Sequence, residues 1–143
     1  MPLFPTEAWF EDVRGVFNVD ETYRGAGGGR CSCRSAMKIG ARNFLVVFEG
    51  LECVEAREVD STELDSCDFY LEMPADDWVE MVRDIAENDG ASLHYTLNTL
   101  DLEREEGLAR STHNDQYRVD LFYRYNQTFQ FFFDASARVA TTY

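Results

Sequence analysis

Four cysteines are the residues that most directly invite chemistry, because thiolates bind zinc and form disulfides. They are Cys31, Cys33, Cys53 and Cys67. The one close pair has the spacing C-x-C, which is shorter than that of a usual zinc knuckle. No signature of a catalytic cysteine surrounds any of the four. We therefore expect buried or half-buried thiols in strands, and no metal or cofactor.

Proton-transfer chemistry on an apolar substrate would need a carboxylate or histidine inside an apolar cavity, where burial raises the pKa of an acid. The two histidines, His94 and His113, lie apart in the sequence. Among the acids, Asp120 is the best candidate, although a solvated aspartate is the commoner situation. We therefore assign no catalytic residue. A small isomerase-like or hydratase-like enzyme acting on a terpenoid, polyketide or steroid is kept as an alternative function.

A glycine run at residues 25–29 superficially suggests a phosphate loop. It lacks both a preceding strand and a following Gly-Lys-Ser/Thr, so no phosphate site is expected. The run is better interpreted as the end of a short second helix that Asp20 caps.

The charge balance excludes several classes of partner. The 143 residues fit a single domain, residues 1–143, with 13 basic and 27 acidic residues and a net charge of −14. Nucleic acid and anionic membranes require a positive surface, so neither is expected as a partner. The apolar runs are short, such as FLVVF at 44–48, and the acidic start does not resemble a secretory signal. We expect a cytoplasmic protein without stable membrane anchoring.

The elements that position these residues follow from capping and periodicity. Thr6 is the expected cap of a helix through residue 17, with Trp9 and Phe17 on its apolar face. The segments from 31 to 39, 43 to 50, 51 to 59 and 67 to 73 alternate apolar and polar residues or are briefly apolar, which predicts three or four antiparallel strands joined by short turns. The pattern of residues 74–88 predicts a helix that covers these strands. Residues 91–107 are ambiguous and favour a short helix or loop that runs into a strand.

The last segment, residues 114–139, carries the densest group of aromatic residues. At helical spacing its rings form one broad stripe, and Asn114 or Asp115 can cap the helix. We expect one long helix lying on the sheet. Phe131 falls off the stripe, and Trp9 and Phe10 are adjacent on their helix, so a homodimer contact is possible for these rings.

Several stretches together resemble the sterol carrier protein 2 superfamily, in particular its stand-alone bacterial lipid-binding domains. They are FPTEAW at 4–9, NVDETY at 18–23, FLVVFEGLECV at 44–54, DFYLEMPADDWVEM at 68–81 and FYRYNQTFQFFFDASAR at 122–138. The resemblance covers nearly the whole chain. It implies an α+β fold in which helices cover a mostly antiparallel five-stranded sheet around a hydrophobic tunnel for a sterol, fatty acyl chain or acyl-CoA.

The first functional hypothesis is therefore a non-enzymatic carrier of a hydrophobic small molecule or lipid. It predicts an apolar cavity between sheet and helices. The residues expected to line this cavity are Phe48, Trp78, Met81, Phe122, Tyr125, Phe129 and Phe133. The enzyme alternative requires a buried aspartate or histidine at the cavity floor. A third possibility is a structural dimer module whose aromatic residues all belong to the core and the interface.

Overall fold

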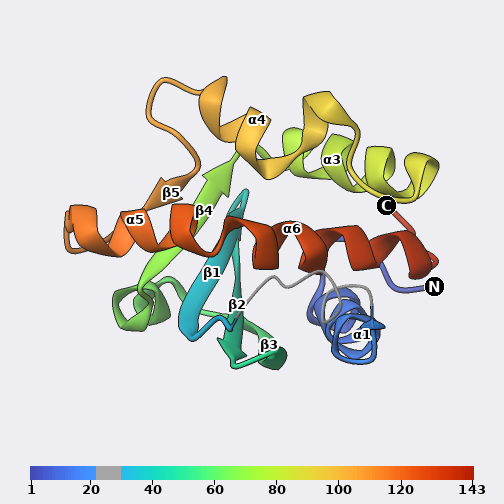
Figure 1. Ribbon diagram of the computed structural model, residues 1–143, viewed down its shortest axis with the longest axis horizontal. Coiled ribbons are helices and arrows are strands. Elements are labelled where there is room, and N and C mark those ends of the chain that lie inside the picture. Colours follow the sequence, from blue (N-terminus) through green and yellow to red (C-terminus); the bar gives the residue numbers. More distant parts are fainter. Residues whose placement is uncertain (22–29) are drawn as a thin grey trace.

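The computed structural model describes residues 1–21 and 30–143, which form an α+β fold with helices on one face of a single sheet (Figure 1). The helices are α1 (Glu7–Asn18), α3 (Ala75–Asn88), α4 (Leu97–Leu102), α5 (Gln116–Arg124) and α6 (Asn126–Asp134). The strands are β1 (Cys33–Ile39), β2 (Arg42–Glu49), β3 (Glu52–Val59), β4 (Phe69–Met73) and β5 (Ala109–Arg110). Short 3-10 helices are η1 (Ser61–Ser66), η2 (Leu93–Tyr95) and η3 (Ala135–Arg138). The predicted second helix and glycine run lie largely outside the described residues.

The sheet has five strands in the order β3-β2-β1-β4-β5, and three of its four strand pairs are antiparallel. β1, β2 and β3 form the predicted meander, with Gly40 and Gly50 turning the chain at φ values of 62° and 66°. β4 instead lies on the other side of β1 and runs parallel to it. Of the three or four antiparallel strands predicted, the first three are confirmed and a fourth in the same run is not. The connection through η1 crosses the outer face of the sheet instead of turning back on β3.

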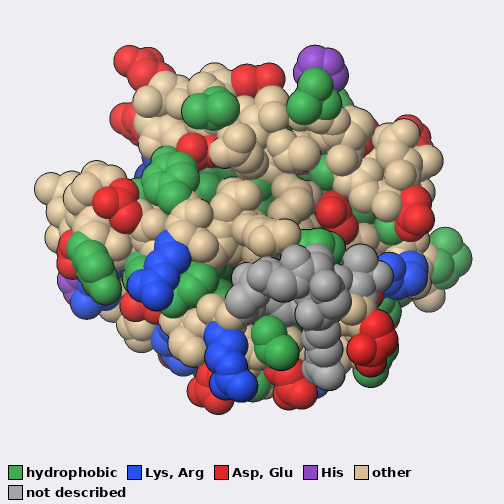
Figure 2. Space-filling view, in the orientation of Figure 1, with side chains coloured by type: hydrophobic (Ala, Val, Ile, Leu, Met, Phe, Trp, Pro, Cys, Tyr) green, Lys and Arg blue, Asp and Glu red, His purple; other side chains and the backbone are tan. Residues whose placement is uncertain are grey.

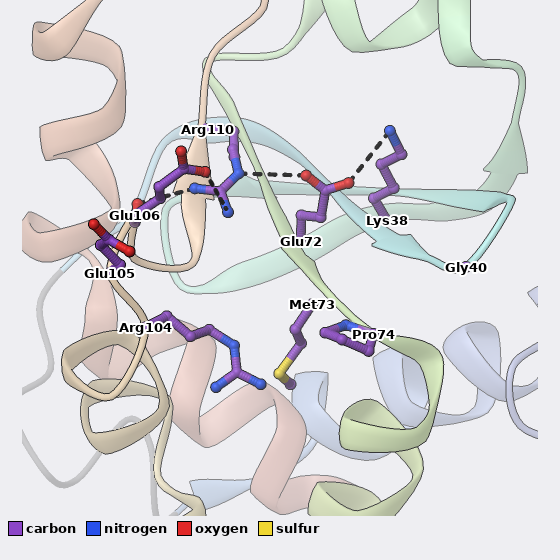
Figure 3. A pocket seen from close by; sticks show the side chains of 9 residues that line it. All are labelled: Lys38, Gly40, Glu72, Met73, Pro74, Arg104, Glu105, Glu106 and Arg110. Atoms are coloured by element: carbon purple, nitrogen blue, oxygen red, sulfur yellow. Dashed lines mark hydrogen bonds and ion pairs between the residues drawn. The ribbon is translucent and has the colours of Figure 1, made fainter.

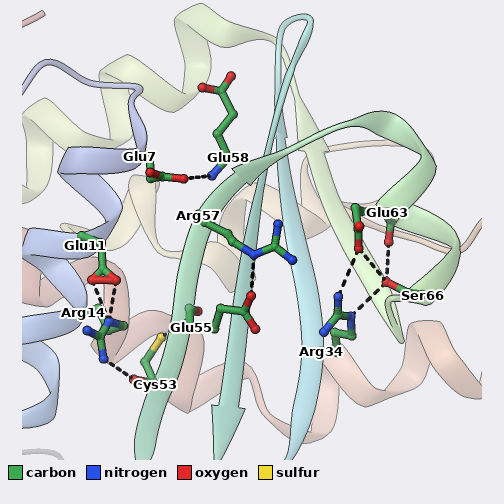
Figure 4. Close-up of polar contacts among 10 residues, drawn as sticks. All are labelled: Glu7, Glu11, Arg14, Arg34, Cys53, Glu55, Arg57, Glu58, Glu63 and Ser66. Carbon is green, nitrogen blue, oxygen red and sulfur yellow. Dashed lines mark hydrogen bonds and ion pairs between the residues drawn. The ribbon is translucent and has the colours of Figure 1, made fainter.

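Side-chain alternation gives the sheet one apolar face and one charged face. The inner, apolar face carries Met37, Ile39, Phe44, Val46, Phe48, Phe69, Leu71 and Met73. The outer face carries a small apolar cluster under η1, formed by Ala36, Leu45, Leu64 and Cys67. Ion pairs surround that cluster, among them Arg34 with Glu63 and Arg57 with Glu55 (Figure 4). The outer face is therefore suited to contact with water.

Helix α1 lies against the edge strand β3, and side chains of α1 form hydrogen bonds with backbone groups of that strand. The Asn18 side chain accepts a hydrogen bond from the Cys53 amide at 2.8 Å and donates one to the Cys53 carbonyl at 2.9 Å. The Glu7 carboxylate accepts a bond from the Glu58 amide at 3.0 Å (Figure 4). Since unpaired edge groups can recruit another strand, these contacts limit pairing at this edge. Thr6 caps α1 as predicted, because its hydroxyl accepts a bond from the Trp9 amide.

Trp9 and Phe10 both lie in the core, each with 0% of its surface exposed. The expectation that adjacent positions cannot both face one core is wrong here. Residues near the two ends of the chain pack against α1 and bury a second side of this helix. Phe4 packs on Trp9 at a ring separation of 4.6 Å, and Trp9 donates a hydrogen bond to Thr141. Phe10 points toward the sheet and stacks on Phe44 at 4.7 Å.

The aromatic segment at the end of the chain forms two helices instead of one. Asp115 caps α5 by accepting a bond from the Tyr117 amide, and the break falls at Tyr125, whose φ and ψ are −106° and 13°. This break lets Phe122 pack on Phe69 of β4 at 5.9 Å while α6 turns its own rings toward α1 and α3. Phe131 is half-buried against the core. The predicted helix is thus correct in its cap and its buried face, and wrong in its continuity.

The predicted helix at residues 74–88 is confirmed as α3, which buries Trp78, Met81, Val82 and Ile85. The ambiguous segment that follows contains η2 and α4, and its strand, β5, begins only at Ala109. α3 and α6 meet near their carboxyl ends, where Asp134 accepts hydrogen bonds from the Ala91 amide at 3.0 Å and from Gln130 at 2.9 Å. No helix among the described residues has the length and apolar character needed to cross a membrane.

We predict that Phe132→Ala lowers the free energy of unfolding by about 3–5 kcal/mol, because it removes a fully buried ring and leaves a cavity. Tyr117→Ala, at a side chain that is 71% exposed, serves as the control and should change stability by less than about 0.5 kcal/mol. Urea unfolding followed by circular dichroism measures both. Equal effects of the two substitutions would contradict the central role of Phe132.

We predict that Asp134→Asn stabilises the protein at pH 7. Burial raises the pKa of the Asp134 carboxyl, and the carboxylates of Asp84 and Asp89 raise it further, against the opposing bonds from Ala91 and Gln130. A folded-state pKa above the unfolded value of about 3.9 means that stability is fully present below that value and falls as pH rises through the folded pKa.

Asparagine keeps the accepting oxygen and does not ionise, so the stability advantage of the variant should be larger at pH 7 than at pH 4. Urea unfolding of both proteins at the two pH values measures this difference. A variant that is less stable than the natural chain at pH 7, by a margin that shrinks toward pH 4, would show that the ionised carboxylate stabilises the junction.

Candidate functional site

The structure brings together the seven residues that were predicted to line a ligand cavity. They lie between the inner face of the sheet and helices α3, α5 and α6. Six of them are fully buried, and Tyr125, at the break between α5 and α6, is half-buried. Several of their rings contact one another directly. Phe48 and Phe129 are 5.1 Å apart, and Trp78 and Phe133 are 5.7 Å apart, measured between ring centroids. Their role in ligand binding stays a prediction.

A pocket of about 700 Å³ lies elsewhere, at the carboxyl ends of β1 and β4 (Figure 3). We call it the β1/β4 pocket. Its lining residues are Lys38, Gly40, Glu72, Met73, Pro74, Arg104, Glu105, Glu106 and Arg110. None of the seven predicted residues is among them. The pocket forms because β1 and β4 are parallel, so both strands end on the same side, where β1 turns into β2 and β4 leads into α3.

A chain of charged groups crosses this pocket (Figure 3). The Lys38 ammonium lies 3.3 Å from one carboxylate oxygen of Glu72, and Arg110 Nε lies 3.3 Å from the other. Lys38 and Glu72 are register partners on neighbouring strands, which fixes their approach. Arg110 also donates a bond to the Glu106 carbonyl at 2.9 Å, while its distance to the Glu106 carboxylate is 3.6 Å. Glu72 is therefore held from both sides.

The apolar part of the pocket comes from Met73 and Pro74, at the junction of β4 and α3. Pro74 is exposed, whereas Met73 is only 4% exposed and belongs to the aromatic core. Met73 therefore lies between the pocket and the buried rings. Arg104 completes this side and pairs with Asp77 of α3. The pocket thus combines an apolar patch with charged groups of both signs.

The loop that carries Arg104, Glu105 and Glu106 is fixed by the buried carboxylate of Asp101, which is 6% exposed. Asp101 accepts a hydrogen bond from the Leu108 amide at 2.7 Å. Burial raises the pKa of the Tyr123 hydroxyl, and its hydrogen bond to Asp101 adds to that effect. Gly107 passes so close that an added Cβ would lie 2.8 Å from an Asp101 oxygen. Asp101 therefore has a structural role.

The residues considered for catalysis or metal binding lie apart. Asp120 is exposed on α5 and accepts a bond from Gln116, which agrees with the preferred interpretation of a solvated aspartate, so it does not supply the buried carboxylate that the enzyme alternative requires. His94 and His113 are both exposed. In the part of the chain that the structure describes, no three histidine, cysteine, aspartate or glutamate side chains converge as a metal site would require.

The four cysteines are free and buried, as expected, although Cys31 and Cys67 lie just outside strands. Burial raises the pKa of Cys53 to about 12 and that of Cys67 to about 11. The hydrogen bond with Cys31, at 3.9 Å between sulfurs, and burial also raise the pKa of Cys33. Since the thiolate is the reactive form, these thiols are poorly suited to nucleophilic chemistry.

Dimer formation stays a prediction. The large exposed hydrophobic residues include Met1, Val19, Leu93, Leu102 and Tyr117, which come from separate parts of the chain. On the face seen in Figure 2, the described hydrophobic side chains form small groups between charged ones. Stable homodimers usually bury larger continuous apolar surfaces.

We predict that Gly107→Ala lowers the free energy of unfolding by more than about 1 kcal/mol, because Gly107 has a φ of 73° and lies against Asp101. Gly15→Ala is the matched control. Gly15 lies in α1 with open space around it, so alanine there should raise stability by up to about 1 kcal/mol. Thermal unfolding of the two variants gives the comparison. Stabilisation by both would mean that the loop tolerates a side chain at Gly107.

Sequence reasoning missed the β1/β4 pocket because its charged residues are far apart along the chain. The available signal was local. Lys38 lies between the buried Met37 and Ile39, and Glu72 between the buried Leu71 and Met73, so both were recognisable as outward-facing. Their proximity follows only from the parallel pairing of β1 with β4.

Comparisons of the chain with protein-family models, curated proteins and solved structures gave no match.

Proposed function

We propose that the protein binds a small amphipathic molecule in the β1/β4 pocket and does not transform it. The observation that carries this proposal is the lining of the pocket, where Met73 and Pro74 offer apolar contact beside the charged groups of Lys38, Glu72 and Arg110. A volume of about 700 Å³ falls within the usual range for small-molecule sites. Such a site matches a ligand with an apolar body and a polar head.

The position of the pocket supports the same function. In open α/β sheets, ligands commonly bind beyond the carboxyl ends of parallel strands whose connections leave on opposite sides of the sheet. β1 and β4 share one feature with that arrangement, because both end on the same side and their chains separate there, β1 into β2 and β4 into α3. The polar groups that would orient a ligand come from strands β1, β4 and β5, so the fold holds them in place.

A ligand is expected to bind in this pocket at a lower cost in free energy than within the layer of rings. A ligand between the sheet and α6 would have to separate rings in contact, such as Phe48 from Phe129 or Trp78 from Phe133. Separating close-packed rings loses dispersion energy, which the contacts of the ligand would first have to replace. The β1/β4 pocket already has space for a guest. Binding there leaves the aromatic core intact.

A second candidate site follows from the resemblance to the sterol carrier protein 2 superfamily. The mixed five-stranded sheet with helices on one face agrees with the arrangement that the resemblance implies. Met73 favours this candidate because it contacts both the pocket and the aromatic core. Methionine is flexible, so its movement would admit an apolar tail toward Phe129 and Phe133. In this version the pocket is the mouth of the carrier's tunnel.

We predict that octanoate, octylamine or octanol binds the purified protein with a dissociation constant below about 1 mM by isothermal titration calorimetry. Glu105→Trp should weaken the binding at least about fivefold, because the indole fills the mouth of the pocket. Glu87→Trp makes the same change on the exposed side of α3, away from the pocket, and should leave binding unchanged.

The outcome of this titration also separates the two candidate sites. Phe129→Leu alters the ring layer without touching the pocket lining, so it should leave binding unchanged if the ligand lies in the β1/β4 pocket. Binding that responds to Phe129→Leu and ignores Glu105→Trp would place the ligand between sheet and helices. Failure of all three probes to bind would contradict the proposed function.

A further inference from the structure

Among the charged residues that the strands contribute to the β1/β4 pocket, positive charges outnumber negative ones. The carboxylate of Glu72 is shared by two cations, Lys38 and Arg110, at 3.3 Å each. All three side chains project from strands, on the outer face of the sheet. One negative charge between two positive ones leaves the group with a local excess of positive charge. Groups held by strands keep that excess in a constant position.

A second acid compensates for this excess only loosely. The Glu106 carboxylate lies 3.6 Å from Arg110, beyond ordinary hydrogen-bond distance, and its side chain is 81% exposed. Exposed ion pairs of this kind contribute little to stability. Arg110 is anchored independently of that carboxylate, because it also binds the Glu106 carbonyl and Glu72. The Glu106 side chain can therefore leave Arg110 without loosening it.

We propose that the β1/β4 pocket takes a small organic anion, whose head group replaces the Glu106 carboxylate on Arg110. Lys38 supplies the second positive charge, since its ammonium has three donors and is about one-third exposed. The head group is a carboxylate, sulfonate or phosphate, all of which match a guanidinium. The apolar body of the ligand lies against Met73 and Pro74. This inference rests on the proposed function and specifies the class of ligand.

A cationic ligand is the main alternative, because Glu105 and Glu106 lie at the mouth of the pocket and the whole chain carries a net charge of −14. Two observations favour the anion. Both glutamates are exposed on a loop, where water weakens their attraction, whereas Lys38 and Arg110 lie on strands and are half-buried. Salt also screens distant charges beyond about 8 Å under physiological conditions, so the local charges dominate.

The test compares octanoate, octylamine and octanol, which share an apolar chain and differ in the charge of the head group. Calorimetric titration at pH 7 and low salt should show octanoate binding about three- to tenfold more tightly than octanol, and octylamine most weakly. Lys38→Gln should remove most of the preference for octanoate over octanol, because it removes the positive charge beside Glu72.

Glu106→Gln should tighten octanoate binding by about two- to fivefold, because the internal competitor loses its charge. Glu87→Gln removes the same charge on α3, away from the pocket, and is the matched control. It should change the affinity for octanoate by less than about 1.5-fold, since its charge is remote and screened.

Each outcome separates the ligand class from the proposed function. Equal binding of octanoate and octanol, or tighter binding of octylamine, would overturn the anion assignment while the binding function stands. Tightening by Glu87→Gln as large as that by Glu106→Gln would assign the effect to net charge and overturn the displacement of Glu106. If none of the three probes binds, the proposed function itself fails.

Discussion

Ring packing on the inner face of the sheet joins the helices to the strands. Phe132 of α6 lies 6.4 Å from Phe10, 5.8 Å from Phe17 and 5.7 Å from Phe48, so one side chain joins α6 to α1 and to β2. Phe133 continues the contacts to Trp78 of α3. These distances are typical of favourable aromatic pairs. The helices are thereby fixed on one face, and the outer face is left to charged residues.

The same division explains where a ligand can bind at low energetic cost. On the inner face, rings such as Phe48 and Phe129 are in contact, whereas the carboxyl ends of β1 and β4 open beside α3 and the loop before β5. That loop is itself anchored, through Asp101 and Gly107, to the body of the protein. Binding groups at this place are charged and partly hydrated, and their loss costs the core little. The fold separates the residues that stabilise it from those proposed to recognise a ligand.

The sequence alone predicted the features that depend on residues close together in the chain. The caps Thr6 and Asp115, the short turn between β2 and β3 and the buried face of α3 all follow from local pattern. The direction of β4 relative to its neighbour could not be predicted in this way, because the alternation of apolar and polar residues in a strand is the same whichever strand it pairs with. Rings that line a cavity and rings that fill a core also have the same spacing, so Phe129 was compatible with both. The break at Tyr125 depends on packing at both of its ends.

We propose that the ligand binds at the ends of β1 and β4 and leaves the ring layer undisturbed. The most direct measurement is a titration of isotope-labelled protein with octanoate, followed by two-dimensional amide NMR. We expect the largest shifts at Lys38, Gly40 and Arg110, and small shifts at Phe129 and Phe132. Shifts concentrated in α6 and its facing strands, with Lys38 and Arg110 unchanged, would contradict it and place the ligand among the rings.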